Sequence, residues 1–599
     1  MMNKFKAGIF LMCSLLIFGA AMSACTPGGG GGETKLPDYL TYYFDAENGN
    51  DANSGTSESA PKQSLEAISA AAATATAENP VKLLFKKGSR FEGNLTLAGY
   101  DSTEKRPLVL DSYGEGEGYP VFEGWGTDTE INAVLSVKDD NITIRNLEIT
   151  GPTAYQGIYV LPAKGGEFAN VVIEGCYVHD VNFQWDYPTA PKDTDPSTIN
   201  LEEVCPETRQ PQGDRYGRYV YRKYSAISFN NDTLSRPSWF NNVTIRNNRV
   251  INIGKIGINV YNMWDNQPGF GYGYNRYAGE DLSVNNAEKK LGRFPHTNIT
   301  AYGNYMECTG GDGLVFSGVE GGVIENNTSY YANYLGRPGF WNAGIWVFGS
   351  RDILMQYNEA AYAFLGGGDG QGFDIDNACS NITFQYNYAH HNEGGGLLLC
   401  NNYTTVSEYD KDGNLLSTES RKGKWENNVV RNNLFAYNGM PSNPSRSAFI
   451  TIARQTDDVF VYNNTVILRD DIAGQSIINT EDKNAKSLCY RNYYYNNLFY
   501  SATNRGAKFT IDMMRDYEFD NNLYFNVGTQ GQNAITGINP LFEITGDLKG
   551  WEAVGKFVPS DVRVFSAGAA FANITPAAKD ILGESVQGIN YIGAFGKAK

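Results

Sequence analysis

Short segments in which apolar and polar residues alternate recur along most of this chain, and many of them end in asparagine. Clear examples are Ile142-Thr-Ile-Arg-Asn146, Val243-Thr-Ile-Arg-Asn-Asn248 and Ile382-Thr-Phe-Gln-Tyr-Asn387. Alternation with a period of two, together with frequent β-branched residues, predicts β-strands and argues against helical repeats. Further copies end at Asn304, Asn327, Asn358, Asn433, Asn464, Asn497 and Asn522.

These asparagines define a repeat. From Asn248 onward their spacings are 56, 23, 31, 29, 46, 31, 33 and 25 residues. A period of roughly 23 to 33 residues with longer insertions is typical of a solenoid, in which each coil buries its apolar face only by stacking on the next. Identical amides stacked about 4.8 Å apart can form a hydrogen-bonded ladder. We therefore interpret the asparagines as structural.

A second strand pattern, Gly-Ile-x-Val-x, follows many of the asparagine units. It stands at residues 157–161, 226–230, 257–261, 313–317, 344–348 and 372–376. Two or three short strands per coil predict an all-β protein that is a parallel β-helix solenoid. The pattern resembles the right-handed parallel β-helix of pectate-lyase-like proteins over roughly residues 80–545. This resemblance implies a carbohydrate-active protein.

The ends of the predicted coil resemble those of secreted β-helix proteins. Residues 38–80, with a helix-like stretch near residues 64–76, resemble an N-terminal cap that covers the open end of the solenoid. Residues 546–599, which include Asn590-Tyr-Ile-Gly-Ala-Phe595, resemble the closing segment. We therefore predict one long domain at residues 81–545 between two end segments.

Three insertions interrupt this domain, at residues 182–224, 262–295 and 402–424. Loops longer than about 12 residues in a compact domain are usually functional or disordered. The first two are rich in Tyr, Trp and Arg, so they either wall a sugar-binding surface or merely decorate the coil. In the third, Asp410-Lys-Asp-Gly413 between strand-like flanks predicts a β-hairpin.

The N-terminal segment has the pattern of a secretory signal. Residues 1–24 contain a short basic start, an apolar run too short for a membrane span and then small residues directly before Cys25. This resembles a bacterial lipoprotein signal, which implies cleavage before Cys25 and lipid on its sulfur. Residues 25–37 then form a glycine-rich tether. We expect an outer-membrane lipoprotein of the cell envelope that faces either the periplasm or the cell surface.

Composition narrows the function classes. Of the 599 residues, 13% are aromatic and 41% are apolar, a content that excludes a disordered chain. The net charge of −17 makes nucleic acid a poor partner. We expect a monomer with a carbohydrate partner.

The cysteines show no Cys/His spacing typical of a metal site. The nearest cysteine pairs are Cys379 with Cys400 and Cys176 with Cys205, and they either form disulfides or remain buried thiols.

Candidate chemistry is concentrated in one short stretch. In the Gly-Ile-x-Val-x strands the two x positions point away from the core, and Asp374 and Asp376 are the only acids among them. Asp369 and Glu393 each precede a strand glycine by three residues, so they align on adjacent coils. Carboxylates this close raise at least one pKa, as a general acid requires. We predict that Asp374 and Asp376 act as base or nucleophile, with Glu393 or Asp369 as acid.

Other residues near these acids are candidates for binding a sugar. Trp346 and Phe348 occupy the outward positions one coil earlier, where a sugar ring can stack. Arg454 is the nearest arginine on a later coil. The predicted substrate-binding set is Trp346, Phe348, His390, His391, Asn259, Tyr261 and Arg454. A histidine at a turn is more often a surface residue than a ligand, so both interpretations of His390 and His391 stay open.

Two family resemblances lead to different chemistries. Gly370-Gln-Gly-Phe-Asp374 looks like the calcium-binding turn of family 9 pectate lyases, which implies Ca²⁺ at Asp369, Asp374 and Asp376 and a lysine base on a later coil. The next strand, residues 396–400, has no lysine. This departure weakens the lyase interpretation.

The second resemblance is to family 120 β-xylosidases, in which an Asp on one coil and a Glu on the next form the catalytic pair. Asp376 matches the Asp, but the Glu position falls on Cys400. Our leading hypothesis is a lipid-anchored glycoside hydrolase that needs no cofactor. The alternatives are a Ca²⁺-dependent lyase of uronate glycans and a non-catalytic glycan-binding lipoprotein.

Overall fold

The computed structural model describes residues 38–126, 133–182, 225–231, 238–262, 294–334, 342–365, 369–401, 403–409, 415–422, 425–481 and 488–598, with only the backbone described in 403–409 and 415–422. The predicted signal and tether, Cys25 and Cys205 lie outside the described residues. So does most of the insertions at residues 182–224 and 262–295.

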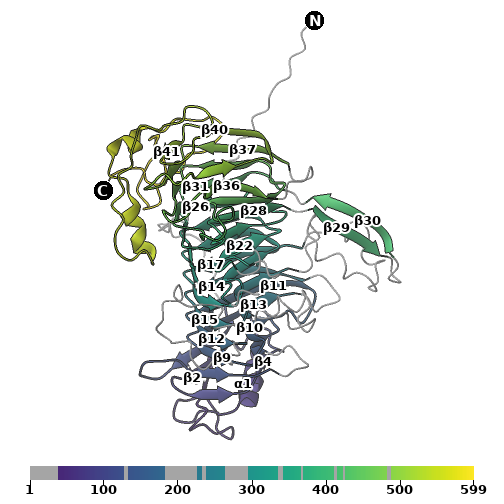
Figure 1. Ribbon diagram of the computed structural model, residues 1–599. Helices are drawn as coiled ribbons and strands as arrows, with labels where there is room; N and C mark the ends of the chain where they lie inside the picture. The colour runs from purple at the N-terminus through teal and green to yellow at the C-terminus, as the bar shows by residue number, and fades with distance from the viewer. Residues whose placement is uncertain are drawn as a thin grey trace, which may run out of the picture. The chain divides into compact units, whose positions relative to one another are not determined.

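The described residues form a right-handed parallel β-helix built from three stacked sheets, here named A, B and C, so the predicted fold class is confirmed (Figure 1). Each coil passes through one strand of sheet A, then sheet B, then sheet C.

Sheet A contains fourteen strands of the described chain, in the order β1 (Leu40–Phe44), β2 (Val81–Lys86), β5 (Leu108–Tyr113), β8 (Ile142–Arg145), β11 (Gly166–Glu174), β14 (Ser238–Arg246), β17 (His296–Tyr302), β20 (Val319–Glu325), β23 (Arg351–Gln356), β26 (Thr383–Gln385), β31 (Asn428–Arg431), β34 (Val459–Tyr462), β37 (Cys489–Tyr495) and β40 (Met514–Asp520).

Sheet B contains thirteen strands within the same ranges, β3 (Arg90–Glu92), β6 (Val121–Glu123), β9 (Glu148–Gly151), β12 (Tyr177–Val181), β15 (Arg249–Ile253), β18 (Tyr305–Thr309), β21 (Thr328–Tyr330), β24 (Glu359–Ala361), β27 (Tyr388–His390), β32 (Leu434–Ala436), β35 (Thr465–Ile467), β38 (Leu498–Tyr500) and β41 (Leu523–Phe525).

Sheet C contains twelve described strands, β4 (Leu95–Leu97), β7 (Ala133–Val137), β10 (Gln156–Val160), β13 (Ser225–Asn230), β16 (Ile256–Tyr261), β19 (Leu314–Ser317), β22 (Ile345–Phe348), β25 (Phe373–Ile375), β28 (Leu397–Asn401), β33 (Ile450–Arg454), β36 (Ser476–Glu481) and β39 (Lys508–Thr510).

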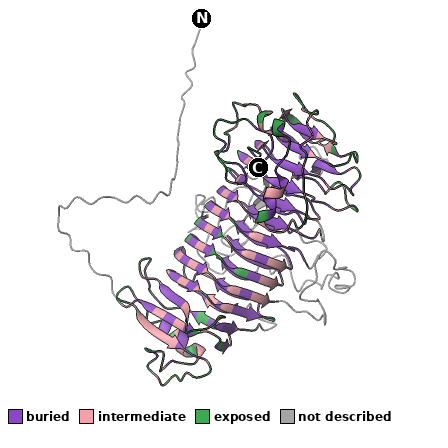
Figure 2. Ribbon diagram, turned by 90° about the vertical axis from the view of Figure 1, so that its left-hand side faces the viewer, coloured by how far each residue is buried: buried purple, intermediate pink, exposed green. Residues whose placement is uncertain are grey.

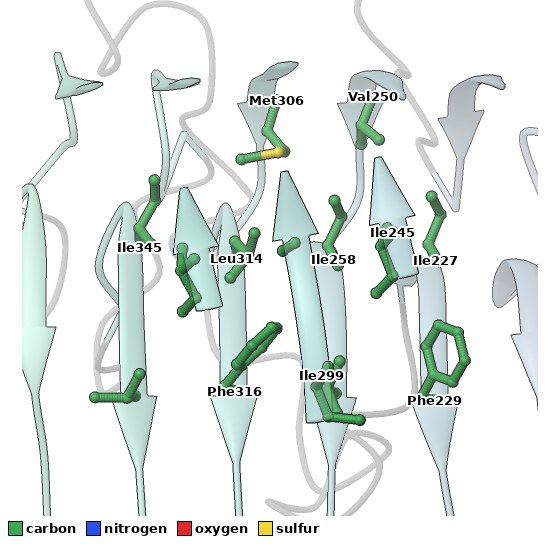
Figure 3. Close-up of a cluster of buried hydrophobic side chains, with 14 of the residues drawn as sticks. Ile227, Phe229, Ile245, Val250, Ile258, Ile299, Met306, Leu314, Phe316 and Ile345 are labelled. Carbon is green, nitrogen blue, oxygen red and sulfur yellow. The ribbon is translucent and has the colours of Figure 1, made fainter. Parts of the chain in front are cut away.

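The alternation seen in the sequence fills the interior of the coil. Ile258, Leu314 and Ile345 stand on consecutive strands of sheet C, and each is fully buried. Figure 3 shows these side chains stacked toward Ile245 and Ile299 of sheet A. Along the strands of Figure 2, buried positions alternate with half-buried ones. Because each apolar residue packs on its equivalent in the next coil, burial depends on stacking, as in other solenoids.

The predicted asparagine ladder is confirmed. From Asn248 to Asn522, each Nδ2 donates a hydrogen bond to the Oδ1 of the next ladder asparagine at 2.8–3.1 Å. Each Nδ2 also donates to a backbone carbonyl of the coil before, such as Asn358 to Ile324 at 2.8 Å. The residue before each ladder asparagine has positive φ, as in Asn326 at 55°. The ladder therefore holds the turn between sheets A and B.

One sequence match was out of register by a residue. Asn146 has positive φ and its Nδ2 donates to Asp111 Oδ1, so it occupies the position before the ladder. Leu147 and Cys176 take the ladder position in the first coils, and the Cys176 backbone N–H donates to Asn248 Oδ1 at 3.0 Å. Side-chain amides thus begin at Asn248.

The two ends of the coil differ. At the N-terminal end, helix α1 (Leu65–Ala72), capped by Ser64, packs Ile68 and Ala72 into the same core as Phe44. At the other end, the segment with 3-10 helices η5 (Trp551–Phe557) and η6 (Val562–Ser566) folds back against the outer face of sheet B. There the Tyr388 hydroxyl donates to the Leu548 carbonyl at 3.0 Å.

Two further expectations are resolved. Strands β29 (Tyr403–Tyr409) and β30 (Leu415–Lys422) pair antiparallel, so the predicted hairpin is confirmed, although its turn at Asp410–Gly413 lies outside the described residues. Cys379 and Cys400 are buried free thiols, so the disulfide alternative for this pair is wrong. Among the helices of the described ranges, none is long and apolar enough to cross a bilayer.

The ladder gives a stability prediction from two adjacent asparagines. Replacing Asn327 by Ala removes its amide bonds to Asn358 and Ala301 and leaves the Asn304 backbone N–H without its acceptor. We expect the unfolding free energy to fall by about 2–4 kcal/mol in urea denaturation, because buried polar groups are left unpaired. The matched control, Asn326→Ala, changes an exposed residue and costs about 1 kcal/mol, since Ala tolerates positive φ poorly. Equal losses in both variants would contradict a ladder that stabilises the coil.

Candidate active site

Strand β25 places two aspartates on the outer face of sheet C. Phe373 and Ile375 are fully buried in the core, so the alternating positions Asp374 and Asp376 point outward. In the parallel register Asp374 stands between Trp346 of β22 and Leu398 of β28. The alignment of these three residues on consecutive coils is as expected from the sequence.

Asp369 joins them from the turn between β24 and β25. The residue as a whole is 9% exposed, and its Oδ1 lies 3.6 Å from Arg446 Nη1. Burial raises the pKa of Asp369 to about 8, against the opposing charge of Arg446, and the negative charges of Asp376, Glu481 and Asp312 raise it further. A carboxyl group with such a pKa holds its proton at neutral pH, as a general acid must.

Asp374 is the most deeply placed of the three. Its burial raises its pKa well above the usual range, and the nearby charges of Asp376, Asp369 and Asp312 act in the same direction. Its Oδ1 has no hydrogen-bond partner among the described residues. Both effects favour the protonated form of Asp374 in the folded protein.

Asp376 has a more polar environment. It is half-buried, and its Oδ1 accepts a hydrogen bond from the Asn377 backbone N–H at 2.7 Å. The Cys400 thiol also donates to this carboxylate, and burial together with the charges of Asp376 and Asp374 raises the pKa of that thiol. Hydrogen bonds of this kind favour the ionised form of a carboxyl group. The site therefore combines two aspartic acids whose pKa is raised with a third, Asp376, that accepts hydrogen bonds.

Three further residues belong to this cluster: Asp312, which the sequence offers as a source of additional hydrogen bonds to a sugar, and Arg446 and Glu481, which were missed from the sequence. Asp312 lies in the turn before β19, where its Oδ1 accepts from the Ala343 N–H at 3.0 Å. Arg446 lies in the turn before β33 and donates through Nη2 to Glu481 Oε2 at 2.8 Å. The outward column of Asp376 continues through Cys400 and Ala453 to Glu481, which therefore lies three coils after Asp376.

Glu393 has a different environment from the one expected. Its Oε2 accepts a hydrogen bond from the Leu365 backbone N–H at 2.9 Å. The backbones of the two turns do align, since the Gly394 N–H donates to the Gly370 carbonyl at 2.9 Å. The Glu393 carboxylate thus holds the preceding turn, and Asp369 is the better candidate for the acid.

The expected exposed aromatic surface is wrong. Trp346 and Phe348 are 7% and 3% exposed, and they form a separate apolar cluster with Ile256, Val315 and Ala343 on the outer face of sheet C. Their ring centroids lie 6.3 Å apart in an edge-to-face arrangement. They border the carboxyl groups as packing and give the site a low-polarity wall.

The remaining sugar-binding candidates are not gathered at Asp374. His390 and His391 lie at the end of β27 in sheet B, and His390 Nε2 is 3.0 Å from Glu359 Oε1. Burial lowers the pKa of both histidines, to about 3 for His391. Asn259 and Tyr261 are buried on β16, three strands from β25. Arg454 is exposed at the end of β33, with Asn401 as its register partner.

The calcium alternative was tested against the same geometry. Ca²⁺ takes six to eight oxygen ligands at 2.3–2.6 Å. Within the described ranges, no group of three or more His, Cys, Asp or Glu side chains has an arrangement that could hold a metal ion. No chemical step is assigned to a calcium ion.

Comparisons with known proteins agree with the fold. Residues 275–414 match the family described as the right handed beta helix region. The chain is 26% identical to lacto-N-biosidase of Bifidobacterium longum subsp. longum over 579 residues, an alignment that covers 84% of this chain and 32% of that protein. The chain thus spans 32% of the length of this relative.

Two solved structures were also similar. A GH136 lacto-N-biosidase from Eubacterium ramulus is 18% identical with a TM-score of 0.48, covering 76% of this chain and 67% of that chain. XylC in complex with xylose is 12% identical with a TM-score of 0.48, covering 94% and 99% of the two chains.

The environment of Asp374 gives a stability prediction. The pKa of Asp374 is raised in the folded protein above the unfolded value of 3.8. Its contribution to stability is therefore complete below pH 3.8 and is lost as the pH rises from there toward the pKa of the folded protein. Asp374→Asn removes the titration, so at pH 7 we expect the unfolding free energy to rise by about 1–3 kcal/mol.

Urea denaturation at pH 4 and pH 7 measures this gain, which should shrink at the lower pH. The exposed control Glu115→Gln should change stability equally little at both values. A destabilised Asp374→Asn variant at pH 7 would contradict a buried, protonated Asp374.

Proposed function

We propose that this chain is a glycoside hydrolase that cleaves an oligosaccharide with Asp369 as the acid and Asp376 as the base or nucleophile. The observation that carries the proposal is the pairing of Asp369, whose pKa is raised to about 8, with a half-buried and hydrogen-bonded Asp376. Glycosidases need one carboxylic acid and one carboxylate beside the scissile bond. The similarity to lacto-N-biosidase supports the same class.

Asp369 supplies the proton for the leaving group. As the glycosidic C–O bond breaks, the Asp369 carboxyl transfers its proton to the departing oxygen and becomes a carboxylate. The positive charge of Arg446 then stabilises this carboxylate, because its Nη1 lies 3.6 Å from Oδ1. Because burial disfavours the ionised form, Asp369 stays protonated until it transfers its proton to the leaving oxygen.

Asp376 acts on the anomeric carbon by one of two routes. As a nucleophile it forms a glycosyl ester, and Asp369, now ionised, takes a proton from the water that hydrolyses this ester. As a base it takes the proton from a water molecule that attacks directly. Both routes consume one water molecule. The covalent route returns the proton to Asp369, whereas the direct route leaves Asp376 protonated and Asp369 ionised until proton exchange with solvent resets both groups.

The substrate class is taken from the relative. Its name specifies a lacto-N-bioside, so we propose an oligosaccharide carrying this unit as the first substrate to test. No cofactor takes part in this scheme.

Variants of the carboxyl groups test the assignment. Asp369→Asn and Asp376→Asn should each lower kcat/KM on an oligosaccharide carrying a lacto-N-bioside unit by about 10²–10⁴-fold, because each removes a proton transfer or the attacking group. Glu393→Gln is the matched control and should stay within about tenfold of wild type, since its carboxylate accepts the Leu365 N–H, which a glutamine side-chain oxygen can also accept.

Three results would contradict this proposal. These are unchanged turnover in both aspartate variants, loss of turnover confined to Glu393→Gln, and a new ultraviolet absorbance of the product that disappears with a chelator. The last would indicate a metal-dependent lyase. Binding of glycans without new reducing ends would indicate a non-catalytic protein.

We further propose that the chain is anchored to the outer membrane of the cell envelope through lipid on Cys25. The support is the apolar run followed by small residues before this cysteine. Cells expressing the full chain should incorporate labelled palmitate into it, whereas Cys25→Ala should abolish the label and Cys13→Ala should leave it. Label retained in Cys25→Ala would contradict the anchor.

A further inference from the structure

Arg446 lies between two carboxylates that come from different parts of the coil. Asp369 precedes β25, Arg446 precedes β33, and Glu481 ends β36. Arg446 Nη2 donates a close hydrogen bond to Glu481 Oε2 at 2.8 Å, while Nη1 lies 3.6 Å from Asp369 Oδ1. All three side chains are mostly buried, with 22% of Arg446, 22% of Glu481 and 13% of Asp369 exposed.

The two distances show how the guanidinium is shared. Nη1 has no hydrogen-bond partner among the described residues, so Arg446 acts on Asp369 through charge alone. The shorter contact to Glu481 holds the guanidinium away from hydrogen-bonding distance to Asp369. Since charge interactions grow as the separation and the local dielectric fall, this position decides how strongly Asp369 is pulled toward ionisation.

We propose that Arg446 is a positioning residue, held by Glu481, that sets the pH at which Asp369 gives up its proton. This inference rests on the proposed function of Asp369. It assigns Arg446 and Glu481 a role in the reaction although neither is proposed to touch the sugar. The alternative is that the pair only links the turn before β33 to β36.

The groups around Asp369 give the effect its direction. Arg446 opposes the rise in the pKa of Asp369, and Glu481 adds to it, as do Asp376 and Asp312. Asp374 and the Cys400 thiol also face this cluster from β25 and β28. Glu393, on the next turn, is occupied with the Leu365 N–H. Removing Arg446 or Glu481 should therefore move the proton release of Asp369 in opposite directions.

The test compares the pH dependence of kcat/KM in three variants. The alkaline limb is the part of the pH profile in which kcat/KM falls as Asp369 loses its proton. In Arg446→Gln this limb should shift to higher pH by about one unit, because the opposing positive charge is gone. In Glu481→Gln it should fall by about one unit, because a negative charge is removed and the guanidinium is free to approach Asp369. Arg446→Lys keeps the charge and should stay within about half a unit of wild type.

A matched control comes from a second arginine–aspartate pair. Arg491 lies on β37 of sheet A with its Nε 2.5 Å from Asp458 Oδ1, and its side chain is 47% exposed. Arg491→Gln should leave the alkaline limb unchanged. Limbs that stay fixed in Arg446→Gln and Glu481→Gln, or that move in the same direction, would overturn the proposal and leave a purely structural pair.

A measurement without substrate separates this inference from the proposed function. Urea denaturation across a range of pH gives the unfolding free energy of each variant and of the same variant carrying Asp369→Asn. The pH dependence of the difference between these two free energies reports the pKa of Asp369 in the folded protein. The opposite shifts should appear there as well. If no glycoside is turned over but these shifts occur, the proposed function fails and the coupling of Arg446 to Asp369 stands. Absent shifts overturn the coupling whatever the activity.

Discussion

The hydrogen-bonded ladder of asparagine side chains is the interaction on which the rest of the structure depends. Each amide accepts from one neighbouring coil and donates to the next, with spacings of 2.8–3.1 Å from Asn248 to Asn522. A bond of this kind fixes where sheet A turns into sheet B, and thereby fixes the register of every strand that follows. Residues 23 to 56 positions apart in the sequence are brought onto adjacent coils in this way.

Register is what creates the chemical site. Once coils are stacked in fixed register, Asp374 must lie between Trp346 and Leu398, and the turn carrying Asp369 must lie near the turn carrying Arg446. Apolar neighbours withhold water from these carboxyl groups, which raises their pKa values at a cost to stability. Local destabilisation of this kind is typical of functional sites rather than of structural ones.

The sequence was sufficient for the coil and insufficient for the site. Alternating apolar positions and the spacing of asparagines report directly on burial and stacking, so the β-helix and the ladder followed from them, with only Asn146 misplaced by one residue. Side-chain direction in turns is not encoded by such periodicity. Glu393 therefore seemed equivalent to Asp369, although its carboxylate holds a backbone N–H. Trp346 and Phe348 seemed exposed because alternation places them outward, yet outward residues of sheet C pack on one another. Arg446 was missed because the turn before β33 contains no Asp or Glu, so comparing the acids of equivalent turns does not lead to it.

The central claim is that Asp369 holds a proton at neutral pH because the stacked coils bury it. Infrared difference spectroscopy between wild type and Asp369→Asn, titrated through the pH range, measures the protonation of this single carboxyl group directly. A protonated carboxyl band that persists at pH 7 and falls to about half its intensity around pH 8 is the predicted result. A carboxylate band already present at pH 5 would contradict the claim.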